Sequence, residues 1–433
     1  GLRNEQNVSI SGRNGGLNYY WSIGRTSNEG IVVGEKFEAL RSRLNLDAKI
    51  NDWLTVGMNT QFAKRDEGFI PADQNQVFSS SPWGSEFNDE GTLLRISPQD
   101  DPGAGASSAF LRPTYDDLVD LEHTFNSRVY AKIKLPLGFS YELGFTNRLD
   151  IEEYFYHSSS ENPNNIEGRA QRWNRKQTEY QLDNIIRWDK TIDRHSFGLT
   201  ALFYAERFQT FTTIANANTF EPSDALGFSN LQAGVNQTVA TDDEETTGDA
   251  IMTRLNYNYD SRYNLSLTMR RDGYSAFGLN NKRANFPSIG GAWTISEENF
   301  FKSDFVTFLK LRVSYGENGN RGFGSARGNT TSGGLRSFNN NRGLGAYAQL
   351  SELSAGNYLN VNDGSVSPVP AFNNNTIANP DLRWERTKAT NLGIDFSFAG
   401  GIVEGSIDAY RNITTDLIVR RQLPSVIGFN EVF

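Results

Sequence analysis

The chain has 433 residues with 42 Lys plus Arg, 51 Asp plus Glu and a formal net charge of −9, so no basic excess indicates nucleic acid as a partner. It contains no cysteine, which excludes disulfides, thiolate metal sites and a cysteine nucleophile. Mean hydropathy is −0.54, and no apolar run of the roughly 18 residues that a membrane helix needs is present. A membrane β-barrel remains allowed, because its apolar residues occupy only alternate positions.

Apolar and polar residues alternate in short segments along the whole chain, which is the period-two pattern of β-strands. In one example, Leu54, Val56 and Met58 interleave with Thr55 and Gly57. We expect about fourteen strands on this criterion. They lie near residues 6–13, 17–25, 38–50, 54–65, 123–134, 139–150, 173–189, 195–208, 245–259, 263–271, 286–296, 307–316, 383–398 and 402–412.

The stretch Thr390 to Arg411, which joins the last two of these segments, predicts a hairpin. Its first run places Leu392 and Ile394 on one face, and a turn at Ala399 to Gly401 joins it to the second run. The apolar face would meet a core in a soluble sandwich, but it would meet lipid in a membrane barrel.

The connections decide between these two architectures. Every second connection is short, as at Asn14 to Gly16 and at Asp260 to Arg262, and the intervening ones are longer. This segregation places the long loops at one end of the strands, as in outer-membrane barrels, and is not typical of sandwiches or propellers. We therefore predict an all-β, antiparallel transmembrane β-barrel spanning 1–433, with long extracellular loops near 66–122, 209–244 and 317–382. The near low-complexity stretch 317–345 suits a hydrated surface loop.

Aromatic residues gather near the short connections and predict an interfacial girdle at that edge of the barrel. They are Trp53, Trp188, Tyr259, Tyr263, Phe300 and Phe301.

Charged residues occupy the polar faces of the predicted strands. Because a charge facing lipid near midplane costs a few kcal/mol, we expect these side chains to point into the lumen. We favour contacts with a plug over a polar solute path, since a wide barrel needs its lumen filled. The residues are Arg43, Asp47, Arg128, Lys132, Glu142, Arg254, Arg270, Lys310 and Arg312.

The sequence predicts no catalytic residue, metal site or cofactor, and it leaves the substrate-binding residues unknown. His123, His157 and His195 lack the paired spacing of metal ligands, so we interpret them as isolated surface or rim histidines. The acidic run Thr241 to Glu245 admits a calcium site, but we favour a solvated loop because EF-hand spacing is missing. Nucleophile-elbow, Walker and dinucleotide motifs are absent.

Several stretches resemble one family in order and in register. They are RYNLSLTMRRDGYSAFGLNNKRANFPSIGGAW (262–293), LKLRVSYGENGN (309–320), NPDLRWERTKATNLGIDF (379–396) and DAYRNITTDLIVRRQLPSVIGF (408–429). Two earlier stretches, 7–32 and 43–59, are similar to the same family's first barrel strands. The family is the SusC/RagA group of TonB-linked outer-membrane transporters of Gram-negative, Bacteroidetes-like bacteria.

This resemblance implies a barrel of about 22 strands with an N-terminal plug, a TonB box and a SusD-like surface lipoprotein as a lid. It implies TonB-dependent import of a large nutrient, either an oligosaccharide or a peptide, and no enzyme activity. We expect this chain to be a barrel fragment that lacks the plug and the family's last strands, with its apolar face against outer-membrane lipid.

Two alternatives remain open at this stage, namely a passive pore and a soluble or cell-surface all-β glycan-binding protein. Loop aromatics such as Trp83, Phe87 and Tyr115 could stack on sugar rings, although we favour packing within their own loops.

Overall fold

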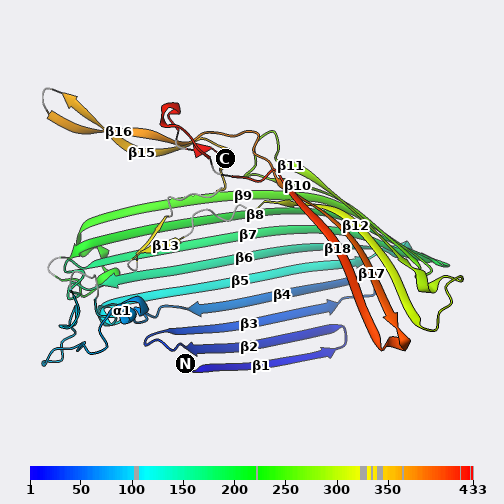
Figure 1. The fold of residues 1–433 in the computed structure, drawn as a ribbon, viewed down its shortest axis with the longest axis horizontal. Helices are drawn as coiled ribbons and strands as arrows, with labels where there is room; N and C mark the ends of the chain where they lie inside the picture. Colours follow the sequence, from blue (N-terminus) through cyan, green and yellow to red (C-terminus); the bar gives the residue numbers. More distant parts are fainter. Residues whose placement is uncertain are drawn as a thin grey trace.

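Fourteen strands form one continuous sheet in the computed structural model (Figure 1), each pairing antiparallel with the next. The structure describes residues 1–101, 107–220, 223–321, 329–332, 335–338, 345–362, 365–419, 421–429 and 431–432. The sheet consists of β1 (Arg3–Asn14), β2 (Leu17–Glu29), β3 (Lys36–Lys49), β4 (Leu54–Asp66), β5 (Asp116–Lys134), β6 (Phe139–Ser158), β7 (Arg169–Ile192), β8 (His195–Phe220), β9 (Gly234–Tyr259), β10 (Tyr263–Tyr274), β11 (Arg283–Thr294), β12 (Val306–Asn320), β17 (Glu385–Phe398) and β18 (Val403–Thr415).

The remaining elements lie in the connections. Two small sheets are made from β13 (Asn329–Ser332) with β14 (Leu335–Phe338), and from β15 (Glu352–Asn362), β16 (Ser365–Thr376), β20 (Glu431–Val432) and β19 (Arg421–Gln422). Two short helices and several single 3₁₀ turns complete the described chain: α1 (Gln74–Ser79), α2 (Leu111–Tyr115), η2 (Pro136–Gly138), η3 (Gly227–Ser229), η4 (Leu231–Ala233), η5 (Ile295–Glu297), η6 (Ala399–Gly401) and η7 (Ser425–Ile427).

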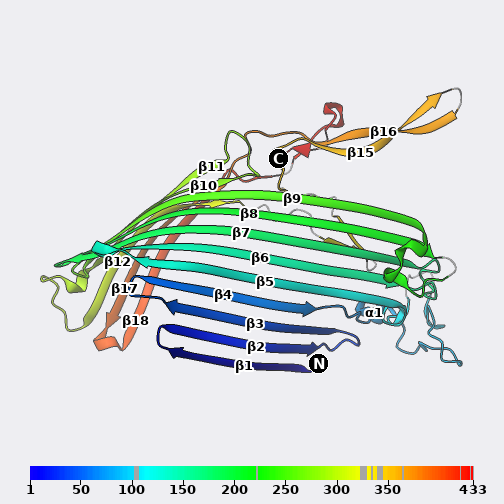
Figure 2. The same ribbon diagram turned by 180° about the vertical axis from the view of Figure 1, so that it is seen from behind.

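The large sheet is strongly curved (Figures 1 and 2). Strands β1 to β9 run side by side as a broad strip, and β10 to β12, β17 and β18 turn away from it, so the sheet has a concave side. The order of pairing makes β1 and β18 its two edges. The fold is therefore an all-β, open segment of barrel wall, and the prediction of an antiparallel β-barrel architecture is confirmed.

All fourteen strands of the sheet occur where alternation predicts them, but several extend further at the long connections. Strand β8 continues to Phe220 and β9 begins at Gly234, so most of the predicted loop 209–244 is paired strand. Likewise β5 begins at Asp116, inside the predicted loop 66–122. Apolar and polar residues no longer alternate regularly there, because the outer face of the extended strands lacks a continuous row of large apolar residues, yet backbone pairing continues.

The long stretch 317–382 also contains more structure than predicted. Strand β12 continues to Asn320, and β13 to β16 lie within the connection. Residues 322–328, 333–334 and 339–344 of the predicted hydrated loop lie outside the described residues.

Apolar side chains cover the convex face of the sheet in a continuous band, which we call the apolar belt. Cross-strand pairing keeps them in register, as in the row Leu199, Leu255, Leu267 and Ile289. These side chains are exposed in the isolated chain, Phe203 by 46% and Leu392 by 50%, as expected of residues that face lipid. The belt also includes Phe62, Phe125, Val129, Phe145, Leu182, Ile186, Ile251, Leu265, Met269, Val313, Ile394 and Ile407.

Aromatic rings follow the belt along the edge that carries the short connections. Ring centroids of Trp188 and Phe197 lie 6.4 Å apart, those of Tyr259 and Tyr263 6.2 Å apart, and those of Trp293 and Phe300 6.4 Å apart. This series agrees with the predicted girdle. The first charged outward residues beyond the opposite edge of the belt include Lys64, Glu153, Arg207, Asp249, Arg271 and Lys388.

Within the described residues, no helix combines the length and the apolar character needed to cross a membrane.

Candidate functional site

The concave side of the sheet, called the inner face below, is polar and charged. Register places Asp47 opposite Gly57 and Gly57 opposite Tyr130, all on the face away from the belt, and the Tyr130 hydroxyl donates to the Asp47 carboxylate. All nine charged residues predicted to point inward lie at inner-face positions of their strands: Arg43, Asp47, Arg128, Lys132, Glu142, Arg254, Arg270, Lys310 and Arg312.

Many of these charges satisfy one another across strands. The carboxylate of Glu142 accepts from Arg128 at 3.0 Å and from Arg187 at 3.2 Å. On the far strands, Arg312 donates to Asp395 at 2.9 and 2.7 Å and to Asp408 at 3.3 Å. Paired charges lining a concave wall indicate a wet interior that presents both signs to whatever fills it.

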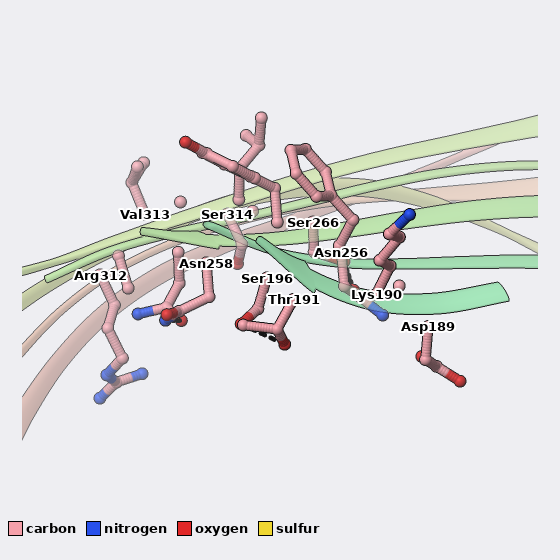
Figure 3. Close-up of a pocket in the computed structure, with 18 of the residues that line it drawn as sticks. Asp189, Lys190, Thr191, Ser196, Asn256, Asn258, Ser266, Arg312, Val313 and Ser314 are labelled. Atoms are coloured by element: carbon pink, nitrogen blue, oxygen red, sulfur yellow. Dashed lines mark hydrogen bonds between the residues drawn. The ribbon is translucent and has the colours of Figure 1, made fainter. Parts of the chain in front are cut away.

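A cavity of about 780 Å³ lies toward the short connections (Figure 3). Two adjacent cross-strand rows of the inner face form most of its lining, and we call these two rows the polar groove. The rest of the lining comes from residues of the opposite register, such as Phe197, Tyr257 and Leu265. Small or amide side chains dominate both rows, so the wall is hollowed where a bulkier residue would project. Among the labelled residues, Arg312, Asn258 and Asp189 point to one side of the sheet and Val313 to the other. The two rows are Asp189, Gly198, Asn256, Ser266, Gly290, Ser314 and Asn391, and Thr191, Ser196, Asn258, Asn264, Ala292 and Arg312.

A different arrangement covers the inner face toward the long connections, beyond the apolar belt. Tyr154, Tyr156, Trp173 and Ile214 form a buried cluster there, with exposures of 4%, 1%, 2% and 4%. Adjacent strands bring them together, because Tyr154 pairs with Trp173 and Trp173 with Ile214. We call this cluster, with the polar groups described next, the aromatic site.

The aromatic site holds one arginine from a distant part of the sequence. Arg336 of β14 donates to Glu152 and, at 3.1 Å, to Asp120. Its guanidinium carbon lies 4.0 Å from the ring centroid of Tyr154 and 6.0 Å from that of Trp173. Alternation in the sequence gives no signal for this contact, because Arg336 lies 184 positions from Glu152.

Burial shapes the electrostatics of this site. Desolvation raises the pKa of Asp120 from its ordinary 3.8 to about 6, against the opposing effect of Arg336. The nearby carboxylate of Glu152 raises it further. The site therefore favours a cation, whose charge offsets two carboxylates in a poorly hydrated setting.

The prediction of isolated surface or rim histidines is wrong for His157, whose side chain is only 8% exposed. Its Nδ1 lies 3.3 Å from Asp117 and its Nε2 lies 3.4 Å from Asp224. Strand pairing places Asp117 opposite His157, and the β8–β9 connection brings Asp224, so neither partner is near in sequence. Among the described residues, no group of three or more His, Asp or Glu side chains is arranged to hold a metal ion.

The acidic run 241–245 lies in strand β9, contrary to the predicted solvated loop. Alternation sends Asp242 and Glu244 to the inner face and Asp243 and Glu245 to the outer face, so the four carboxylates do not converge on one ion. Glu245 instead accepts from Arg207 at 3.0 and 2.8 Å.

The loop aromatics differ from the favoured prediction of internal packing. Trp83 is 88% exposed and Phe87 51% exposed, and Phe78 of α1 is 85% exposed. Three large aromatic side chains of one connection therefore face solvent, while Tyr115, at the end of α2, is partly buried.

Comparison with known proteins gives one family and several relatives. The model of the family described as "TonB dependent receptor-like, beta-barrel" matches residues 65–431. TonB-dependent receptor P39 of Formosa agariphila is 28% identical over 446 residues, which cover 100% of this chain and 39% of that protein. TonB-dependent receptor SusC of Bacteroides thetaiotaomicron is 26% identical over 467 residues, covering 98% of this chain and 42% of SusC.

A solved structure, that of the RagAB peptide transporter, aligns with a TM-score of 0.79 at 22% identity. It covers 99% of this chain and 46% of the matched chain. The chain thus spans about two fifths of the length of the curated relatives that it matches.

Proposed function

This chain belongs to the TonB-dependent receptor-like β-barrel family of outer-membrane receptors, which are not enzymes, and from that premise we propose that it forms part of the wall of an energised importer. The importer takes up a large nutrient, either an oligosaccharide or a peptide. The observation that carries this proposal is the continuous apolar belt backed by a charged inner face across fourteen strands. Only a wall between lipid and a wet lumen needs both faces.

The inner face supports a second part of the proposal, that a plug domain contacts this wall. The polar groove and the paired charges around Arg312 offer hydrogen-bonding groups to a folded polar domain. A channel for free diffusion would not need such a dense set of fixed donors and acceptors. Long connections, including the described parts of 67–115 and 321–384, face the outside of the cell in this proposal.

The exposed aromatics of the β4–β5 connection support a partner or substrate at the outer end. Phe78, Trp83 and Phe87 present flat apolar surface to solvent, which suits stacking on sugar rings or burial beneath a SusD-like lipoprotein lid. The structurally similar RagAB is a peptide transporter, which keeps a peptide substrate alongside a glycan.

The proposal is tested by uptake in the native bacterium with the full-length receptor. We expect labelled oligosaccharide or peptide mixtures to accumulate only when the receptor, TonB and a SusD-like lipoprotein partner are all present. Uptake that persists without TonB would indicate a passive pore. Recovery of the receptor from cells without detergent would instead indicate a soluble or surface-bound glycan-binding protein.

A further inference from the structure

The aromatic site is occupied by a segment of the chain's own backbone in an extended conformation. Strand β14 pairs only with β13 in the described residues, and these two form a sheet separate from the barrel wall. Figure 1 shows β13 on the concave side of the large sheet, in front of β7 and β8. The segment therefore sits against the inner face as a ligand would, without extending the wall.

The inner-face side chain of Gln171 hydrogen-bonds to the backbone of this segment. The Gln171 amide nitrogen donates to the Arg336 carbonyl oxygen at 2.7 Å, and the Arg336 backbone nitrogen donates to Gln171 Oε1 at 2.7 Å. Gln171 is only 1% exposed, and Asn216 fixes its orientation by accepting from the same amide nitrogen at 2.6 Å. A preset amide that satisfies both polar groups of one residue recognises any extended peptide, whatever its side chain.

The surroundings add selectivity for a guanidinium group. Asp120 and Glu152 accept from its two terminal nitrogens, while the rings of Tyr154 and Trp173 offer their faces to the same cation. Arg175 pairs with the second oxygen of Glu152 at 2.7 Å, which holds that carboxylate in place. Leu335, the residue before Arg336, packs on the same aromatic cluster and provides an adjoining apolar subsite.

We propose that the aromatic site binds an arginine side chain of an extended peptide, and that Arg336 occupies it as an intramolecular substitute for that peptide. This inference rests on the proposed import function only for its biological purpose, because binding is measurable without transport. Since a tethered occupant competes at high effective concentration, an incoming peptide binds weakly until Arg336 leaves.

The test uses the full-length receptor in detergent and a fluorescent peptide with the sequence of 333–338, Gly-Gly-Leu-Arg-Ser-Phe, followed by fluorescence anisotropy. We expect Arg336→Ala to tighten peptide binding by at least about tenfold. Arg321→Ala is the matched control, because it removes an arginine of the same connection that pairs with Glu206 and lies outside the site. It is expected to leave binding at the wild-type level.

Two further measurements establish selectivity. A peptide with alanine in place of arginine is expected to gain far less from Arg336→Ala than the arginine peptide does, because it makes only the backbone contacts to Gln171. The double variant Arg336→Ala/Glu152→Gln is expected to lose most of the gain of the single variant, and Arg336→Ala/Gln171→Ala to weaken both peptides alike.

The proposal is overturned if Arg336→Ala binds the arginine peptide no better than Arg321→Ala does, or if it gains equally for the alanine peptide. In either case Arg336 only anchors its own connection. Failure of the import proposal is seen separately, as uptake that does not depend on TonB while the arginine-selective gain remains.

Discussion

The two ends of the inner face differ in how they are filled. Toward the short connections the polar groove presents Gly, Ser and Asn side chains and stays open over about 780 Å³. Toward the long connections, beyond the belt, the aromatic site is dry, buried and already occupied by Arg336. One sheet thus carries an open surface of small polar residues at one end and a buried, already filled site at the other.

The largest difference between the aromatic site and the polar groove is expected when one side chain is truncated in each. Trp173→Ala is expected to cost about 3–5 kcal/mol of unfolding free energy, because Trp173 is 2% exposed and its removal leaves a cavity. Asn256→Ala in the polar groove is expected to change it by no more than about 0.5 kcal/mol. Guanidinium unfolding of the full-length receptor in lipid vesicles, followed by circular dichroism, measures both. Equal losses would contradict a dry site opposed to a wet groove.

A second experiment separates the two faces at the groove itself. Leu267→Arg places a charge in the apolar belt, where Leu267 is 37% exposed, and is expected to cost about 2–4 kcal/mol. Its neighbour Ser266 lines the groove, so Ser266→Arg is the matched control and is expected to fold with little loss. Comparable insertion yields of the two variants into vesicles would contradict the assignment of the faces.

The pH dependence of Asp120 sharpens the comparison further. Because its folded-state pKa of about 6 exceeds its ordinary 3.8, its contribution to stability is present at low pH and is lost as pH rises through about 6. Arg336→Ala removes a cation and is expected to raise this pKa, whereas Glu152→Gln removes a neighbouring negative charge and is expected to lower it. Infrared titration of the protonated carboxyl band, with Asp120→Asn to assign it, measures both directions. A pKa that does not respond to either change would contradict the contact.

The smallest expected effect is at Gly290 in the groove. A Cβ added there meets no atom closer than Ser314 Cβ at 3.7 Å, so Gly290→Ala is expected to alter the unfolding free energy by under about 0.5 kcal/mol. At Gly57 an added Cβ would overlap the ring of Tyr130, so Gly57→Ala is expected to cost more. Guanidinium midpoints of both variants give the comparison, and a larger loss at Gly290 would show that the groove is already filled.

The sequence predicts the wall far better than the sites upon it. Alternation places every strand of the large sheet, because lipid on one side and water on the other impose period two on each strand. The signal ends where the apolar belt ends, before Arg207 in β8, because the outer face of the strand beyond that residue no longer carries the lipid-facing apolar row. The partners of His157 and the contact between Gln171 and Arg336 join segments far apart in the chain, and no local pattern encodes them. The Gly- and Asn-rich composition around Arg336 even predicts a hydrated loop.

The length of β8 sets how far the sheet extends beyond the apolar belt. The strand runs for 26 residues, and the belt ends before Arg207. At about 3.3 Å per residue, the part beyond the belt adds roughly 45 Å along the strand direction. Because β8 and β9 stay paired beyond the belt, they form a rim that is stiffer than a loop of the same length. Shortening β8 and β9 by equal numbers of residues would therefore lower this rim without removing any residue of the belt.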